Sequence, residues 1–170
     1  MTRNLDFNDR GDVVGAIERV VGLRSWHVAF VEELCTAIGL WLGEKRPRQR
    51  PLLRASESES ARYEPEMKLT IWCPWRVRFA DEIVFSAEGS EPETVRSEAG
   101  RLMESRMVSV KIGSVGWDLS LRFETGLILE TFSSLDQATN PWMRSDISLV
   151  FDGRRLALGP GATFRISDFP

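Results

Sequence analysis

The sequence predicts an α+β fold in which two tandem repeats, each a helix followed by antiparallel strands, form a mostly antiparallel sheet with helices packed on one side. Two segments carry apolar residues at helical spacing, and most other apolar segments alternate with a period of two. A helix, strand, hairpin and Pro-Trp pair also occur twice in the same order. The chain has 170 residues, 42% of them hydrophobic, which suits a single domain with a substantial core.

The first repeat is predicted to cover residues 12–89. Its helix is expected at residues 12–22, because apolar residues recur there three and four positions apart and Gly22 offers an end. Residues 44–66 lose this periodicity and predict a long loop. Strands are expected at residues 26–31, 37–42, 67–72 and 77–85.

The second repeat is predicted to cover residues 90–153. Its helix is expected to start at Ser90 or Glu91, with Pro92 in the first turn and an apolar stripe after it. A short hairpin is expected at residues 124–126. Strands are expected at residues 107–112, 117–123, 127–132 and 147–151, with two short strands in the C-terminal segment 154–170.

The predicted hairpin registers give the two repeats different outer faces. In the second repeat, a Phe123–Leu127 pair would place Arg122 diagonal to Glu130 on a charged, solvated face. The same register in the first repeat, with Leu42 opposite Leu69 and Leu40 opposite Ile71, would give an aromatic and apolar outer face.

Three residues are expected on that aromatic face: Trp41 and Trp72 as diagonal neighbours, and His27 beside them. Exposed aromatic residues of this kind mark a partner or ligand site. Alternatively, a helix, the other repeat or the end of the chain covers the face. Self-association through the same patch is a third interpretation.

The predicted loop at residues 44–66 carries its charges in two blocks. Residues 45–54 hold five positive charges and no negative one, whereas residues 57–66 hold four carboxylates. Arg46, Arg48, Arg50 and Arg54 are therefore candidates for contacts with phosphate or an acidic partner. The alternative is that the acidic block compensates them within a solvated loop.

The sequence contains no recognisable catalytic motif. His27 is the single histidine, and the nucleophile elbow, the P-loop and the dinucleotide-binding fingerprint are absent. Cys35 and Cys73 are too few for a disulfide framework or, with one histidine, a four-ligand zinc site, and both are expected to be free thiols. We expect no cofactor and no metal.

Charge and hydropathy exclude further classes. The formal net charge of −3 makes nonspecific nucleic-acid binding an unfavourable hypothesis. No apolar stretch reaches the length of a membrane span, and residues 1–12 show no apolar signal region. A cytoplasmic location is therefore expected.

Residues 102–161 resemble an uncharacterised family of small bacterial α+β proteins, a domain of unknown function. The resemblance depends on a Trp-Asp-Leu strand at 117–119, a Phe-x-x-Gly hairpin at 123–126, a lone Trp at 142 and a Gly-rich turn at 159–161. These motifs are structural and carry no catalytic residue. Similar bacterial domains are found near toxin and immunity genes, so the resemblance implies an immunity-like context and a partner-binding role.

These observations favour a non-enzymatic, immunity-like protein-interaction module that occludes the surface of a partner. The predicted partner-binding residues are Trp41, Trp72, His27, Arg46, Arg48 and Arg50. One alternative is a small-ligand-binding protein or weak hydrolase, with a Trp-lined cleft between the repeats and a carboxylate such as Asp118. The other alternative is a structural homo-oligomer.

Overall fold

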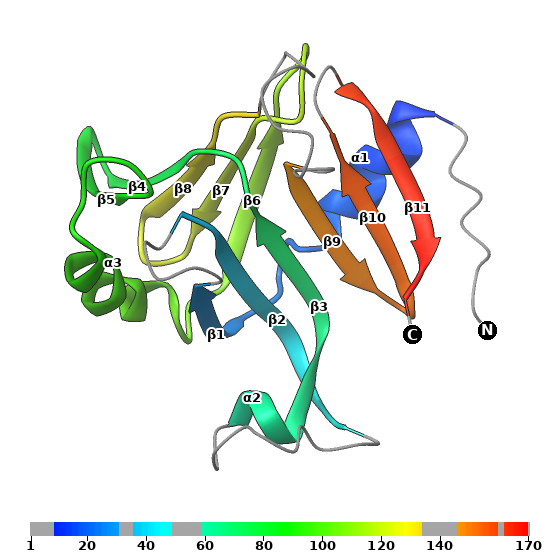
Figure 1. The fold of residues 1–170 in the computed structure, drawn as a ribbon, viewed down its shortest axis with the longest axis horizontal. Helices are drawn as coiled ribbons and strands as arrows, with labels where there is room; N and C mark the ends of the chain where they lie inside the picture. The colour runs from blue at the N-terminus through cyan, green and yellow to red at the C-terminus, as the bar shows by residue number, and fades with distance from the viewer. Residues whose placement is uncertain (1–8, 31–35, 49–58, 134–145, 160–161, 170) are drawn as a thin grey trace.

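A computed structural model of the chain describes residues 9–30, 36–48, 59–133, 146–159 and 162–169. Two antiparallel sheets are present within these residues (Figure 1), in the strand orders β1-β2-β3-β9-β10-β11 and β5-β4-β8-β7-β6. The first sheet consists of β1 (Ser25–Phe30), β2 (Ile38–Pro47), β3 (Tyr63–Ile71), β9 (Ile147–Phe151), β10 (Arg154–Leu158) and β11 (Phe164–Asp168). The second consists of β4 (Trp75–Phe79), β5 (Glu82–Ser86), β6 (Met107–Ile112), β7 (Leu119–Phe123) and β8 (Leu127–Thr131).

Helices are short and few among the described residues. They are α1 (Arg10–Glu18), α2 (Glu59–Arg62) and α3 (Pro92–Ala99), which continues into a 3₁₀ turn at Gly100–Leu102. Asp9 caps α1 by accepting a hydrogen bond from the Asp12 N–H, and Pro92 occupies the first turn of α3 as predicted. The prediction of an α+β protein with antiparallel sheets is confirmed.

Each sheet takes a hairpin from the other half of the chain. The β4–β5 hairpin follows β3 in sequence but joins β8, with Val77 opposite Leu129. The β9–β10 hairpin follows β8 but joins β3, with Leu149 opposite Leu69. Neither half of the chain therefore forms its sheet alone.

The two sheets also meet near the starts of β1 and β6. The Ser25 N–H donates a hydrogen bond to the Ser105 carbonyl, and the Met107 N–H donates one to the Leu23 carbonyl, both at 2.9 Å. Between these bonds lies one antiparallel bridge. This junction holds the two sheets together at one edge.

One hydrophobic core lies between the sheets. Leu40 of β2, Leu69 of β3, Leu121 of β7 and Leu129 of β8 are buried in it, because alternate residues of each strand face inward. Helix α1 adds buried apolar residues, including Ile17. The space between the two halves of the chain is therefore filled by side chains from both sheets.

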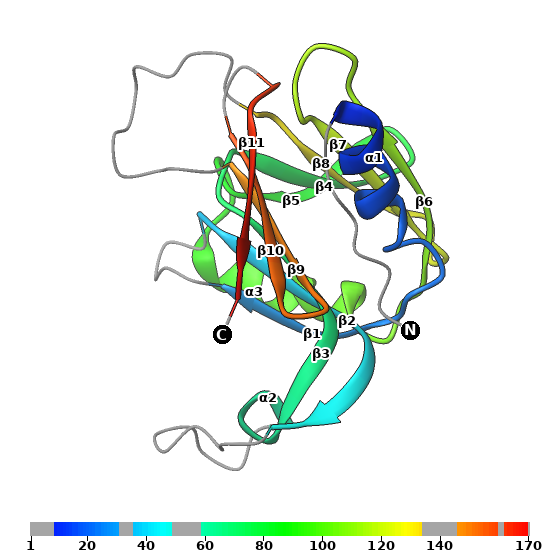
Figure 2. The ribbon, with the colours of Figure 1, turned by 90° about the vertical axis from the view of Figure 1, so that its right-hand side faces the viewer.

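The expectation that the helices pack together on one side is wrong. Figures 1 and 2 place α1 beside β6 and the β9–β11 strands, and α3 at the opposite end of the molecule near β5. The exchange of hairpins explains this arrangement, because each helix reaches an end where strands from both halves of the chain meet. Arg19, at the end of α1, forms an ion pair with Asp152 in the β9–β10 turn at 2.8 Å.

Two predicted elements differ from the structure. Residues 77–85, expected to be one strand, form a hairpin that turns at Ala80, whose φ is 51°. Strands extend into the predicted loop at 44–66, because β2 continues to Pro47 and β3 begins at Tyr63, and these two residues pair. This ribbon projects beyond the rest of the sheet toward α2 (Figure 1), where strands pair through their backbones without a core-facing apolar pattern.

The predicted register of β2 against β3 is shifted by two residues. Leu42 lies opposite Met67 rather than Leu69, and Leu40 opposite Leu69 rather than Ile71. A shift of two keeps every side chain on its predicted face but changes its neighbours. The predicted register in the second half, with Leu121 opposite Leu129, is confirmed.

Candidate binding site on the outer face of the first sheet

Trp41 lies at the centre of an aromatic cluster on the outer face of the first sheet. The Trp26 ring meets it edge-on at 5.2 Å between centroids, and the His27 ring at 4.9 Å. Both neighbours reach Trp41 because β1 has a bulge at this point, where its register against β2 shifts between Ser25 and His27. A strictly alternating strand would have placed Trp26 on the inner face.

Three cations lie over these indole rings. The Lys45 ammonium is 5.1 Å from the Trp26 ring centroid, and the Arg48 guanidinium and Lys68 ammonium are each 5.6 Å from that of Trp41. Cations at such distances are attracted to the negative face of an aromatic ring. Three positive charges therefore lie against the rings of Trp26 and Trp41, which together form the aromatic floor of this site.

The aromatic floor is covered rather than exposed. Trp41 is 7% exposed and Trp26 is 5% exposed. Both indole N–H groups are buried, with no hydrogen-bond acceptor among the residues that the structure describes. A buried donor without an acceptor costs about 1–3 kcal/mol, so this floor is not optimised for stability alone.

A groove of about 330 Å³ opens beside this cluster. Its lining includes Trp41 and the apolar residues Pro65, Val150 and Phe169, together with Phe151, whose side chain belongs to the core. The charged residues that line the groove are the cations Arg46, Arg48 and Lys68 and the acids Glu64, Glu66 and Asp152.

The three carboxylates of the groove are already engaged. Glu64 binds Arg48 at 3.1 Å, and Asp152 binds Arg19 at 2.8 Å. Glu66 Oε2 accepts a hydrogen bond from the Glu44 N–H at 3.2 Å. These contacts leave the positive charges of Arg46 and Lys68 without a carboxylate within the described part of the chain.

Burial is the main cause of a lowered pKa at two residues of this cluster, and neighbouring cations contribute. Burial lowers the pKa of Lys68, and the positive charges of Arg48 and Arg155 lower it further. Burial also lowers the pKa of His27, which Glu59 raises and Lys68 lowers. An anion bound at Lys68 would therefore reduce the repulsion that Lys68 experiences from Arg48 and Arg155.

The structure brings together four of the six predicted site residues. His27 and Trp41 are in contact, and Arg46 and Arg48 line the groove that Trp41 floors. Arg50 lies outside the described residues.

Trp72 is not a neighbour of Trp41, contrary to the prediction. In the observed register Trp41 lies opposite Lys68, and Trp72 follows the end of β3. The half-buried Trp72 is held there by its N–H, which donates to the Asp146 carbonyl at 2.7 Å.

Two important residues, Lys68 and Arg155, were missed by the sequence reasoning. Lys68 lies between the buried residues Met67 and Leu69, so the alternation of a strand is enough to place it on the outer face. Arg155 lies opposite Val150, and its Nε donates to Ser148 Oγ at 2.9 Å. No local sequence pattern predicts that Arg155 lies near Lys68, because this proximity depends on the pairing of β3 with β9.

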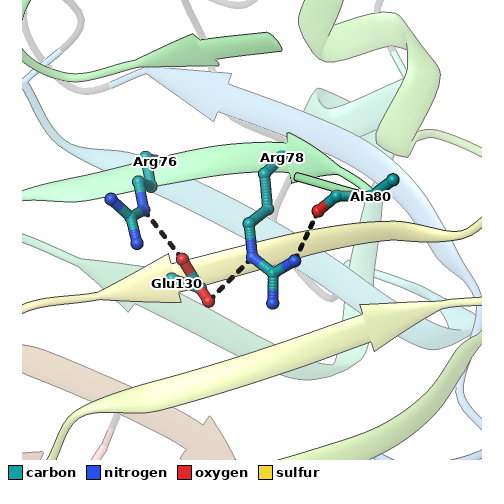
Figure 3. A network of polar contacts seen from close by, with 4 residues as sticks. All are labelled: Arg76, Arg78, Ala80 and Glu130. Atoms are coloured by element: carbon teal, nitrogen blue, oxygen red, sulfur yellow. Dashed lines mark hydrogen bonds and ion pairs between the residues drawn. The ribbon is translucent and has the colours of Figure 1, made fainter. Parts of the chain in front are cut away.

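The outer face of the second sheet is a useful contrast, because two of its arginines share a carboxylate. Glu130 accepts hydrogen bonds from Arg76 at 2.7 Å and from Arg78 at 2.9 Å (Figure 3). Burial raises the pKa of Glu130, but the hydrogen bonds and charges of the two arginines outweigh burial and lower it. The predicted partner, Arg122, is replaced by these residues because β4 lies beside β8.

The remaining candidates for chemistry have structural roles. Asp118 Oδ1 accepts hydrogen bonds from the Ser133 N–H and hydroxyl at 2.6 and 2.9 Å. Cys73 is a buried free thiol, as predicted, and burial, followed by the charge of Asp146, raises its pKa to about 12. Cys35 lies outside the described residues. No group of three His, Cys, Asp or Glu side chains suited to a metal occurs in the part of the chain that the structure describes.

The described residues define an α+β protein with two antiparallel sheets around one core and a cationic, aromatic groove on one outer face. Comparisons of the chain with known protein families, with curated proteins and with solved structures found no match. None of the described helices is long and apolar enough to span a membrane.

Proposed function

We propose that the protein is a non-enzymatic interaction module that binds an acidic surface of a partner protein through the groove beside Trp41. The observation that carries this proposal is the presence there of two cations, Lys68 and Arg46, that form no ion pair with a carboxylate in the described part of the chain, whereas Glu64 and Asp152 are paired with arginines. Such a module would act by occlusion in the cytoplasm, as an immunity-like protein does. Charge complementarity would speed association and favour acidic partners.

Trp41 has a different role in this proposal from that of an inserted anchor. With 7% of its surface exposed, it offers a partner little area to bury. Instead, its ring lies against the charged groups of Lys68 and Arg48 and helps to hold them in position. Trp72 lies away from this cluster and is not part of the proposed surface.

We also propose that the chain is an internal duplication in which the two copies exchange hairpins. The strand order β1-β2-β3-β9-β10 corresponds to β6-β7-β8-β4-β5. Matching hydrogen bonds support the correspondence: the Trp72 N–H donates to the Asp146 carbonyl at 2.7 Å, and the Phe132 N–H donates to the Pro74 carbonyl at 2.9 Å. The equivalent turns after β4 and β9 both contain a residue with positive φ.

This duplication provides an internal comparison for the binding site. The strand pairings make Thr70 of the first sheet the counterpart of Glu130 in the second, because each follows the inward leucine that pairs with β2 or β7. In the first sheet Ser148 and Val150 take the positions of Arg76 and Arg78, and Lys68 takes that of Ile128. The first sheet therefore has, in place of two arginines that share a carboxylate, a lysine with no ion pair among the described residues, and this difference supports a binding role for its outer face.

Capture of partners from a lysate of the native host tests the proposed function. Wild type is compared with an Arg46→Gln/Lys68→Gln variant and with an Arg122→Gln/Lys111→Gln variant, which removes two exposed cations from the second sheet. We expect wild type and the second variant to retain the same acidic protein and the first variant to lose it. Equal capture by all three folded proteins would contradict the proposed surface.

Binding of a free small anion is the second candidate function, favoured by the volume of the groove. About 330 Å³ lies at the lower end of the range for small-molecule sites. This groove is on an outer face, unlike the cleft between repeats that the sequence suggested. A homo-oligomer is tested by size-exclusion chromatography, in which a monomer has a mass of 19.3 kDa at all concentrations.

A further inference from the structure

We propose that Lys68 is the centre of a subsite for one carboxylate, supplied by an acidic side chain of the partner protein with apolar residues beside it. The inference rests on the proposed function and specifies the chemistry that the groove recognises. Lys68 would bind the carboxylate directly, and Arg46 would approach it from the rim. Both residues line the groove.

The first argument is the electrostatic position of Lys68. Its ammonium is half-buried over Trp41, and among the described residues it has no carboxylate partner. Arg155 lies on the same face, two strands away, through the pairings Lys68–Val150 and Val150–Arg155. A bound carboxylate would relieve the repulsion between these cations, which no other described carboxylate does.

The second argument is the apolar wall of the groove. Val150 and Pro65 line it, and Phe169 does so while remaining 45% exposed. An apolar side chain next to the carboxylate would cover this exposed aromatic surface. A free inorganic anion would leave it in water.

The third argument concerns the charge of the ligand. Arg48 already donates hydrogen bonds to Glu64 from Nη1 and to the Ser60 carbonyl from Nε, so fewer of its N–H groups remain for a ligand. One half-buried ammonium and one rim guanidinium match a monoanion better than a dianion, because burying a second negative charge requires further donors. The groove therefore favours a carboxylate over a phosphate.

A peptide-binding experiment tests the subsite directly. The probe is acetyl-Glu-Leu-Glu-Phe-amide carrying a fluorophore, and its control has both Glu residues replaced by Gln. We expect saturable binding of the Glu peptide to the full chain at low salt, at least tenfold weaker binding of the Gln peptide, and weaker binding of both as salt screens the charges. No saturable binding of the Glu peptide to folded wild type would overturn the proposal.

Two matched variants locate the binding. Lys68→Gln should weaken the Glu peptide at least tenfold, whereas Lys111→Gln, which removes an exposed cation of β6, should leave it unchanged. Circular dichroism verifies that both variants fold, and Lys68→Arg, which keeps the charge, should restore most of the affinity. Equal affinity of wild type and Lys68→Gln would exclude Lys68 as the ligand.

The single histidine gives a second readout. His27 contacts Trp41, and Lys68 lowers its pKa, so a carboxylate bound at Lys68 should raise the pKa of His27. The imidazole resonances are followed by NMR against pH, with and without peptide. An unchanged His27 pKa at saturating peptide would place the peptide elsewhere and overturn the proposal.

Competition experiments separate the outcomes. Inorganic phosphate or propionate that displaces the peptide at equal concentration would overturn the preference for a peptide carboxylate and leave a general anion site. A partner captured from lysate without any binding of the peptide would refute the subsite but not the interaction module. Peptide binding at Lys68 without a captured partner would support the subsite and contradict the module.

Discussion

Replacing Lys68 by Met should stabilise the fold at neutral pH while weakening binding. Lys68 faces Arg155 across two strand spacings, a distance of about 10 Å. At that distance two unit charges repel by about 0.4 kcal/mol at an effective dielectric constant of about 80 and by about 1.7 kcal/mol at about 20. Arg48 adds a repulsion that its pairing with Glu64 reduces.

One favourable contact opposes this gain. Lys68→Met removes the cation–π contact with Trp41, which is worth about 0.5–1 kcal/mol, while the unbranched Met side chain keeps most of the packing. At the effective dielectric constant of about 20 that suits half-buried groups, the difference is a net stabilisation of about 0.7–1.2 kcal/mol at low ionic strength. For a domain of this size that corresponds to a rise in Tm of about 1–5 °C.

Thermal unfolding at pH 7, in about 10 mM and about 1 M salt, measures this effect. Salt at the higher concentration screens charges beyond about 3 Å, so the advantage of Lys68→Met should disappear. The same variant should raise the pKa of His27, because a neighbouring positive charge is removed. A loss of stability at low salt, or a gain that persists at high salt, would refute the electrostatic reasoning.

Three further predictions concern the rest of the molecule. Glu130→Gln should cost about 1–3 kcal/mol, because it leaves two arginines without a carboxylate, whereas Arg122→Ala should change the stability by less than about 0.5 kcal/mol in urea unfolding; equal effects would contradict the network. Cys73 should resist alkylation at pH 8 until the protein unfolds, since its pKa of about 12 leaves almost no thiolate; rapid labelling of the native thiol, identified by peptide mass, would show that it is accessible. Fragments 1–88 and 89–170 should each remain unfolded alone and fold when mixed, as followed by circular dichroism, because each sheet needs a hairpin from the other fragment; independent folding of either fragment would argue against the exchange.

The stability contribution of His27 has a defined pH window. Its pKa is lowered from 6.5 in the folded state, so the unfolded chain binds a proton more readily. This contribution is present above pH 6.5 and is lost as the pH falls through the lowered pKa. The same reasoning applies to the lowered pKa of Glu130, whose contribution is present above pH 4.5 and is lost in acid.

The sequence by itself determined most of the elements and the face on which most strand residues lie. The alternation of Ile38, Leu40 and Leu42 requires a strand with one buried face, and Pro92 correctly marks the start of α3. The charged face with Glu130 and the half-buried position of His27 follow from the same period of two. These features depend on residues close together in the chain.

Only the tertiary structure decided which strands are neighbours. A period of two is unchanged by a register shift of two, so the pattern could not separate a Trp41–Thr70 pair from the observed Trp41–Lys68 pair. It also could not place Arg155 near Lys68, because that proximity depends on the β3–β9 pairing between distant parts of the chain. Strand pairing depends on backbone hydrogen bonds that every residue except proline can make, so the choice of partner is settled by the packing of the whole core.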